Sequence, residues 1–441
     1  MSLAIIECPG LTRRLMAHAP KLTALGQAHN LPPVFPALTL PAHGALLTGQ
    51  PPERHGLVAN GWYDRAHDQV FMWRQSEGLL DAPPLWETAR QQRPDYSCLK
   101  HFWWPGMAST ADTTVNVRPV YFADGRKSGG VYSNQQGLAA ELESRFGQFP
   151  LFQFWGPAAD IRSTQWICDT AAWLATERAP ADLNLIYLPH LDYKQQTLGP
   201  NHPDIAKEVR ELDDAASELV ASLQAAGIDC VVCSSYGMNE VSQPIHLNRL
   251  FREKGWLKTV RNAAGELIDF AESDVFAVSD HQIANVYVRN EAMRTEVRGF
   301  LEELDGVDSV QVGRHEREGE FLLTAEKHAW FTYYYWLDDA LAPDFARTVA
   351  IHAKPGYDPC EMLIDPTIAF AKAKVISKVL RKKLGFRMLM DVIPLDANLI
   401  KGSHGRLPES DEEMPVWIST RSDLPAPASF LDVHAWALTH G

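Results

Sequence analysis

The run from residue 35 to residue 63, FPALTLPAHGALLTGQPPERHGLVANGWY, is the part of the chain best suited to chemistry. Thr39 stands between two prolines at an expected strand-to-helix corner, and Asn60 follows in a second turn. A threonine hydroxyl becomes a nucleophile when a metal ion or an adjacent base lowers its pKa. Free N–H groups at the start of the helix would favour an anionic substrate such as phosphate. A helix-capping role for Thr39 explains the same pattern equally well.

Short apolar runs indicate the elements that would position such side chains. The runs with the length and composition of buried parallel strands are residues 3–7, 183–188 and 230–234. A helix-spaced pattern between the last two completes a βαβ unit, which favours a mostly parallel sheet with helices on both faces. Glu7, Asp192 and Ser235 each follow the end of one of these strands. Because ligand sites gather at the carboxyl ends of parallel strands, we expect these three side chains to lie together.

Composition limits the classes of partner. The 441 residues are 46% hydrophobic and 22% charged, as in an ordinary soluble globular protein. The net charge of −14 argues against nucleic acid or an anionic membrane as a partner. An anionic substrate would therefore need a local positive centre, such as a bound metal ion or a helix N-terminus. The chain shows no signal-peptide pattern, and Cys230 and Cys233 fall inside an apolar strand, so we expect a cytoplasmic protein with reduced thiols.

The segment around Thr39 resembles the nucleophile segment of the nucleotide pyrophosphatase/phosphodiesterases, a family of the alkaline phosphatase superfamily. That family reads roughly FP-x-x-T-F-P-N-H followed by TG-x-x-P-x-x-HG-x-x-x-N. The residues that match are Phe35, Pro36, Thr39, Pro41, His43, Thr48, Gly49, Pro52, His55, Gly56 and Asn60. The resemblance implies that Thr39 attacks phosphorus and that Asn60 donates a hydrogen bond to a phosphoryl oxygen. Leu40 replaces the family's base-stacking aromatic residue, so a nucleotide substrate is not implied.

The same resemblance implies a centre of two metal ions whose ligands come from segments spread over nearly the whole chain. The residues at the ligand positions are Glu7, Thr39, Asp192, Gln196, Ser235, Tyr236 and His404. Four of them depart from the family pattern: Glu replaces Asp at position 7, Gln replaces His at 196, and Ser-Tyr replaces Asp-His at 235 and 236.

This altered ligand set changes the expected metal content. Two dications about 4 Å apart need several anionic ligands to offset their repulsion, and few are present. We expect one divalent ion, zinc or manganese, held by Asp192, His404 and Gln196 with an open position. A second ion beside Glu7 and Thr39 would be weak or absent, so the prediction is one or two ions.

Three more residues are candidates of lower rank. Asp280 and His281 are adjacent in the segment SDHQ and could restore the missing Asp-His pair, although a helix cap or a structural hydrogen bond also explains them. His190 lies two residues before Asp192 and could orient its carboxylate, or it could be a surface histidine.

The order of the segments predicts an alkaline phosphatase-like α/β core with an inserted cap. We place the core at residues 1–240, the cap with some core elements at 241–395, and the completion of the core, with the late His segment, at 396–441. Within these, the basic stretch from Lys372 to Arg387 is interpreted as a solvated helix face, and residues 407–428 as a surface loop rich in Pro, Ser and Asp.

The function that follows is a metal-dependent phosphohydrolase in which Thr39 attacks a small phosphorylated or phosphonate substrate. Three alternatives stay open: a protein of the same fold that only binds a phosphorylated metabolite, a phosphoryl transferase, and a structural or partner-binding protein. A site filled by side chains would favour the last of these. The sequence does not indicate the oligomeric state.

Overall fold

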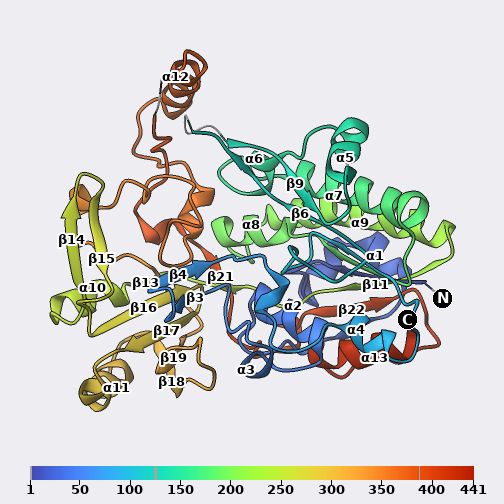
Figure 1. Ribbon diagram of the computed structural model, residues 1–441, viewed down its shortest axis with the longest axis horizontal. Coiled ribbons are helices and arrows are strands. Elements are labelled where there is room, and N and C mark those ends of the chain that lie inside the picture. The colour runs from blue at the N-terminus through green and yellow to red at the C-terminus, as the bar shows by residue number, and fades with distance from the viewer. Residues whose placement is uncertain (1, 124–126, 387) are drawn as a thin grey trace.

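The computed structural model describes residues 2–123, 127–386 and 388–441, and its centre is a sheet of eight strands (Figure 1). In spatial order the strands are β2 (Ala28–Asn30), β22 (Val416–Ser419), β11 (Ile228–Cys233), β1 (Ser2–Glu7), β10 (Leu183–Tyr187), β5 (Cys98–His101), β6 (Thr113–Val117) and β9 (Val131–Ser133). The five strands from β11 to β6 run parallel, whereas β22, β2 and β9 pair antiparallel at the two edges. The predicted α/β class with a mostly parallel sheet is confirmed.

Helices cover both faces of this sheet, which explains why its central strands are apolar without alternation. One face carries α1 (Pro20–Leu25), α5 (Leu138–Phe146), α6 (Leu151–Phe154), α7 (Ile161–Trp173), α8 (His190–Leu198) and α9 (Ile205–Ala225). The other face carries α2 (Thr39–Thr48), α3 (Pro52–His55), α4 (Leu85–Arg90) and α13 (Val433–His440). In the described part of the chain, no helix is both long and apolar enough to cross a membrane.

The tail differs from the expectation of a surface loop over residues 407–428. Its residues Val416–Ser419 form β22, which lies between β2 and β11 and is buried up to Ile418. Four residues, VWIS, make too short an apolar run to stand out among the surrounding Pro, Ser and Asp residues. Tertiary pairing with β11 therefore determines this strand.

A second layer of strands stands beside the core. A four-stranded antiparallel sheet is formed, in spatial order, by β16 (Val275–Asp280), β17 (Ile283–Val288), β19 (Phe321–Ala325) and β18 (Val307–Val312), with α10 (Leu247–Glu253) and α11 (Arg294–Glu302) packed on it. Two-stranded ribbons are β3–β4 (Gly61–Asp64, Gln69–Met72), β7–β8 (Val120–Tyr121, Lys127–Ser128), β12–β21 (Asn239–Glu240, Gly402–Ser403), β13–β20 (Gln243–Ile245, Ala329–Phe331) and β14–β15 (Lys258–Asn262, Gly265–Asp269). This layer has its own hydrophobic cluster, and the predicted domain boundaries stay a prediction.

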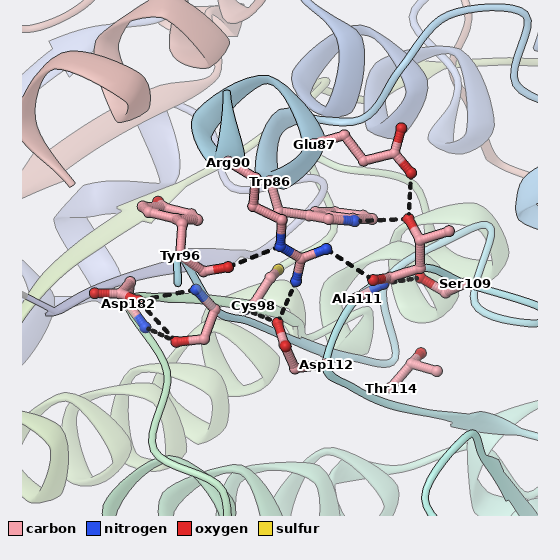
Figure 2. A network of polar contacts seen from close by, with 12 residues as sticks. Trp86, Glu87, Arg90, Tyr96, Cys98, Ser109, Ala111, Asp112, Thr114 and Asp182 are labelled. Atoms are coloured by element: carbon pink, nitrogen blue, oxygen red, sulfur yellow. Dashed lines mark hydrogen bonds and ion pairs between the residues drawn. The ribbon is translucent and has the colours of Figure 1, made fainter. Parts of the chain in front are cut away.

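A polar network fastens the amino ends of two core strands (Figure 2). Arg90, the last residue of α4, donates from Nε to the carbonyl of Tyr96 at 2.9 Å and from Nη2 to Asp112 Oδ2 at 2.6 Å. The same carboxylate oxygen of Asp112 accepts from the backbone N–H of Cys98 at 2.7 Å. These bonds hold the starts of β5 and β6 at the edge opposite the carboxyl ends, where the candidate site lies.

Candidate active site

Thr39 is the first residue of α2, and the carboxyl ends of β1, β10 and β11 surround it. The preceding residue, Leu38, is extended (φ −128°, ψ 158°), and the helix starts at Thr39 as expected. The strand expected before it is absent: residues 31–38 form a loop, so the corner joins a loop to a helix. Beyond β10, Asp192 and Gln196 lie one turn apart on α8, and Tyr236 follows β11. The parallel sheet therefore brings together residues that are almost 200 positions apart in the chain.

A hydrogen-bonded chain leads from Thr39 to Asp192. The hydroxyl of Tyr236 lies 2.9 Å from Thr39 Oγ1 and donates to Asp192 Oδ1 at 3.4 Å, so Thr39 donates to Tyr236. Gln196 Nε2 donates to the other carboxylate oxygen of Asp192 at 2.8 Å. The amide carbonyl of Gln196 accepts from the hydroxyl of Tyr357 at 2.9 Å. Burial raises the pKa of Asp192 to about 7, and nearby Glu7 adds to the shift.

Glu7 has its own set of donors. One carboxylate oxygen accepts from the backbone N–H of Ser235 at 3.2 Å and from the hydroxyl of the same residue. The other accepts from His43 Nε2 at 3.1 Å, because His43 Nδ1 accepts from the backbone N–H of Trp104 at 3.0 Å and must be unprotonated. Burial lowers the pKa of His43, which keeps the ring neutral despite the carboxylate.

Asn60 is held between the core and the four-stranded sheet β16–β17–β19–β18, which lies in the predicted cap region and is called the cap sheet below. Its Oδ1 accepts from the backbone N–H of Leu40 at 3.0 Å, one residue after Thr39. Its backbone N–H and Nδ2 donate to the two carboxylate oxygens of Asp280, at 2.7 and 3.2 Å. Burial raises the pKa of Asp280 to about 6. Asp280 thus restrains the side chain that the family resemblance assigns to a phosphoryl oxygen.

Two histidines and two tyrosines stack beside Asp192. His404 Nδ1 donates to the carbonyl of Ala37 at 2.8 Å, which leaves Nε2 unprotonated and 3.6 Å from Asp192 Oδ1. The ring of His404 stacks on that of Tyr236 with centroids 3.9 Å apart. The centroid of the His281 ring lies 3.8 Å from that of His404, with the two rings tilted by 42°. Tyr357 stacks on His281 at 3.7 Å. Burial lowers the pKa of both histidines, so both rings are neutral.

The structure gathers the predicted site residues with one exception. Those that converge are Glu7, Thr39, Asn60, Asp192, Gln196, Ser235, Tyr236, Asp280, His281 and His404. His190 instead lies against α9, with Nε2 3.2 Å from Glu208 Oε2. Two site residues were not predicted. His43 stood in the matched motif without an assigned role, and Tyr357 comes from a loop of the cap with no local signal.

The side chains present do not fit the two-ion centre that the resemblance implies. Tyr236 occupies the space between Thr39 and Asp192, and Ser235 donates to Glu7 rather than offering a charged ligand. Within the described ranges, the group of three His, Cys, Asp or Glu side chains with ligand atoms within 4.8 Å of one another consists of His190, Glu208 and Glu211. The described residues around Thr39 do not form such a group.

The site is also closed to a substrate. The exposed fraction of Thr39 is 2% and that of Tyr236 is 1%. A cavity of about 310 Å³ opens nearby, along Phe35 and Pro36 and across to Arg314, but Thr39 does not line it. An approach to the Thr39 hydroxyl therefore requires the stacked rings or the cap to move.

Fold and site together define an alkaline phosphatase-like α/β protein with a threonine at the start of the helix beside the sheet. The solved structures agree on the fold. Murine ectonucleotide pyrophosphatase/phosphodiesterase 5 superposes with a TM-score of 0.59 at 14% identity, covering 99% of this chain and 94% of the other. Phosphonoacetate hydrolase from Sinorhizobium meliloti 1021, in complex with phosphonoformate, superposes with a TM-score of 0.61 at 15% identity, covering 100% and 95%.

The family profile described as type I phosphodiesterase / nucleotide pyrophosphatase matches residues 3–358, so the chain belongs to that family of phosphoester hydrolases, which is typically metal-dependent. An uncharacterised pyrophosphatase/phosphodiesterase of Schizosaccharomyces pombe is 26% identical over 240 residues, 52% of this chain and 40% of that protein. Human ectonucleotide pyrophosphatase/phosphodiesterase family member 1 is 24% identical over 250 residues, 54% of this chain and 23% of that protein. The chain thus spans less than half the length of these curated relatives.

Proposed function

We propose that this chain is a non-hydrolytic member of its family, in which the residues at the catalytic positions form a structural junction. One observation carries the proposal. Each neutral residue that replaces a metal ligand donates a hydrogen bond to a carboxylate that remains: Ser235 to Glu7, and Tyr236 and Gln196 to Asp192. The carboxylates are thereby satisfied without a cation.

The junction also joins the core to the cap. Asp280 ends a cap strand and holds Asn60, and Tyr357 from a cap loop donates to Gln196 of α8. His281 stacks between Tyr357 and His404. These packed residues link the core to the cap and cover the Thr39 hydroxyl. We keep a cytoplasmic location as part of the proposal, supported by six cysteines that are all free.

A second candidate is the Thr39-dependent phosphohydrolase, with zinc or manganese and a small phosphorylated or phosphonate substrate. The observation in its favour is the proton path from Thr39 through Tyr236 to Asp192, whose raised pKa suits a base near neutral pH. In this case Tyr236 would have to swing away and the cap would have to open before a substrate reached Thr39. A phosphoryl transferase or a binder of a phosphorylated metabolite at Thr39 would need the same opening.

Turnover of bis(4-nitrophenyl) phosphate with added zinc or manganese tests the proposal. We expect the wild-type protein to match Thr39→Ala at every metal concentration, with or without an alcohol acceptor. Metal-dependent turnover that Thr39→Ala abolishes would show that the chain is an active enzyme. Mass spectrometry measures the metal bound by each protein. A loss of bound metal in Asp192→Asn would assign it to the junction, and a loss in His190→Gln would assign it to the separate group of His190, Glu208 and Glu211.

A restoring variant serves as the positive control. Glu7→Asp, Gln196→His, Ser235→Asp and Tyr236→His together return the ligand types of the family pattern. We expect this variant, checked for folding by circular dichroism, to bind zinc in an amount that Asp192→Asn reduces. If the wild-type protein already binds as much zinc at Asp192 as this variant does, the junction is a metal site and the proposal fails.

A further inference from the structure

A helical projection stands away from the body of the molecule, at the top of Figure 1. We call residues 370–386, FAKAKVISKVLRKKLGF, the finger; it contains α12 (Ala371–Lys383). The finger contains six Lys or Arg residues and no Asp or Glu, although the whole chain carries a net charge of −14. The stretch from Lys372 to Arg387 is expected from the sequence to be a solvated helix face. Lys372, Arg381 and Lys383 are exposed, in agreement with that expectation, whereas Lys374 and Lys378 are partly buried, and Arg387 lies outside the described residues.

The polar side of α12 faces the protein. Lys374 and Lys378, one turn apart, both form ion pairs with Asp391 in the chain segment that returns from the finger. Lys374 also donates to the carbonyl of Asp391 at 3.0 Å, and Lys378 to that of Leu389 at 2.7 Å. Val375, on the same side, packs against the hydrophobic cluster of the second layer. The inward side of α12 is therefore mixed, although an amphipathic helix of a globular protein usually turns most of its apolar residues inward.

The apolar side of α12 consequently faces solvent. Ile376 and Leu380, one turn apart on the opposite side from Lys374 and Lys378, are 60% and 55% exposed. Leu384 continues this stripe at 75%, and Phe370 precedes it at 87%. Soluble proteins rarely leave such a contiguous set of large apolar side chains uncovered, and such sets mark sites of interaction.

We propose that the finger binds the surface of an anionic lipid bilayer, with α12 lying in the plane of the headgroups. A short helix with aliphatic and aromatic side chains on one face and lysines beside them has the composition of an interfacial helix. Lys372 and Lys383 are exposed at the two ends of the apolar stripe, where their stems can lie along it while their ammonium groups reach lipid phosphates. This inference does not depend on the function proposed for the junction.

The combination of negative charge and apolar depth favours a bilayer over a second copy of the chain as the occupant. A second copy offers acidic surface but must also cover the apolar stripe of a convex, projecting helix. A bilayer supplies apolar depth and phosphate charge in one surface. The sequence argued against an anionic membrane because of the net charge of the whole chain. Electrostatic forces are screened beyond a Debye length of about 8 Å. A basic helix that projects from the protein therefore interacts with a membrane through its own charges rather than through the net charge of the chain.

Co-sedimentation with vesicles tests the proposal on the full chain. We expect the protein to pellet with vesicles of equal parts phosphatidylcholine and phosphatidylglycerol, to stay in solution with pure phosphatidylcholine, and to be released by salt. Replacing Ile376, Leu380 and Leu384 together by Ser should lower the partition coefficient on the order of a hundredfold. Replacing Lys372, Arg381 and Lys383 by Gln should lower it by about fivefold per residue.

Two exposed residues on other parts of the surface provide the matched control. Leu407→Ser and Phe152→Ser remove apolar side chains that are 47% and 56% exposed, and they should leave partitioning unchanged. Circular dichroism of every variant should match the wild-type protein. The proposal is overturned if the wild-type protein ignores anionic vesicles, or if the triple Ser variant pellets as well as the wild type. Sedimentation velocity that shows a dimer lost in the triple Ser variant would instead identify a second copy as the occupant and would overturn it too.

Discussion

Asp192 is a buried carboxyl group, so it should make the stability of the protein depend on pH in a predictable direction. Its pKa is raised to about 7 chiefly by burial, against about 3.9 for an aspartate in an unfolded chain. The folded state therefore holds a proton that the unfolded state has released between these values. The contribution of this group to stability is fully present below about pH 4 and is lost as the pH rises through about 7.

The magnitude follows from the two pKa values. At pH 5 the protonated carboxyl stabilises the fold by about 2 pKa units, or about 3 kcal/mol, and at pH 8 this contribution is close to zero. Asp192→Asn has no proton to exchange, so its free energy of unfolding lacks this contribution at both pH values. Relative to the wild-type protein, the variant should gain about 3 kcal/mol between pH 5 and pH 8.

Urea unfolding at pH 5 and pH 8, in the presence of a chelator, measures this difference. Asp95→Asn, which removes an exposed carboxylate, is the control, and its stability relative to the wild-type protein should change little between the two pH values. The reasoning is wrong if Asp192→Asn shifts stability by the same amount at both pH values. It is also wrong if the wild-type protein gains stability through Asp192 as the pH rises, because that sign belongs to a carboxylate paired with a cation.

Four further variants test the packing around two glycines and one buried ion pair. Gly44→Ala in α2 would place Cβ 2.5 Å from the His55 ring and should cost about 1–3 kcal/mol, whereas Gly299→Ala in α11 meets no atom within 4 Å and should stabilise the protein by about 0.5–1 kcal/mol; urea midpoints compare the two. Lys100→Met should cost about 3–5 kcal/mol because it leaves Glu77, its partner at 2.6 Å, buried and unpaired. Lys100→Met combined with Glu77→Leu should recover most of that loss by the same measurement.

The strands of the parallel core could be predicted from the sequence because both faces of the sheet are buried. The predicted strand at residues 3–7 is β1 (Ser2–Glu7), and the predicted helix after the second strand is α9 (Ile205–Ala225). The strand run is apolar along its buried length, and α9 carries apolar residues at helical spacing, so both patterns are visible without any partner. The short strand β22 could not be found this way, because β11 and β2 supply its pairing from distant parts of the chain.

The candidate site was predictable as a set of positions but not as a set of contacts. Strand ends in a parallel sheet share one edge, so the sequence alone could place Glu7, Asp192 and Ser235 together. Which atoms they bond depends on side-chain rotamers and on the cap. Tyr357, for example, reaches Gln196 from a loop 161 residues further along the chain, and no local pattern encodes that contact.

The changes at the ligand positions make physical sense as one coordinated change rather than as separate losses. Removing dications from a site with several buried carboxylates would leave unpaired anions, each costing several kcal/mol. Here Ser235 and Tyr236 remove one carboxylate and supply donors to the two that remain, and Gln196 supplies a third donor. A single reversion, such as Tyr236→His, would remove a donor without restoring the negative charge that a cation needs. Regaining a metal centre would therefore require several substitutions together.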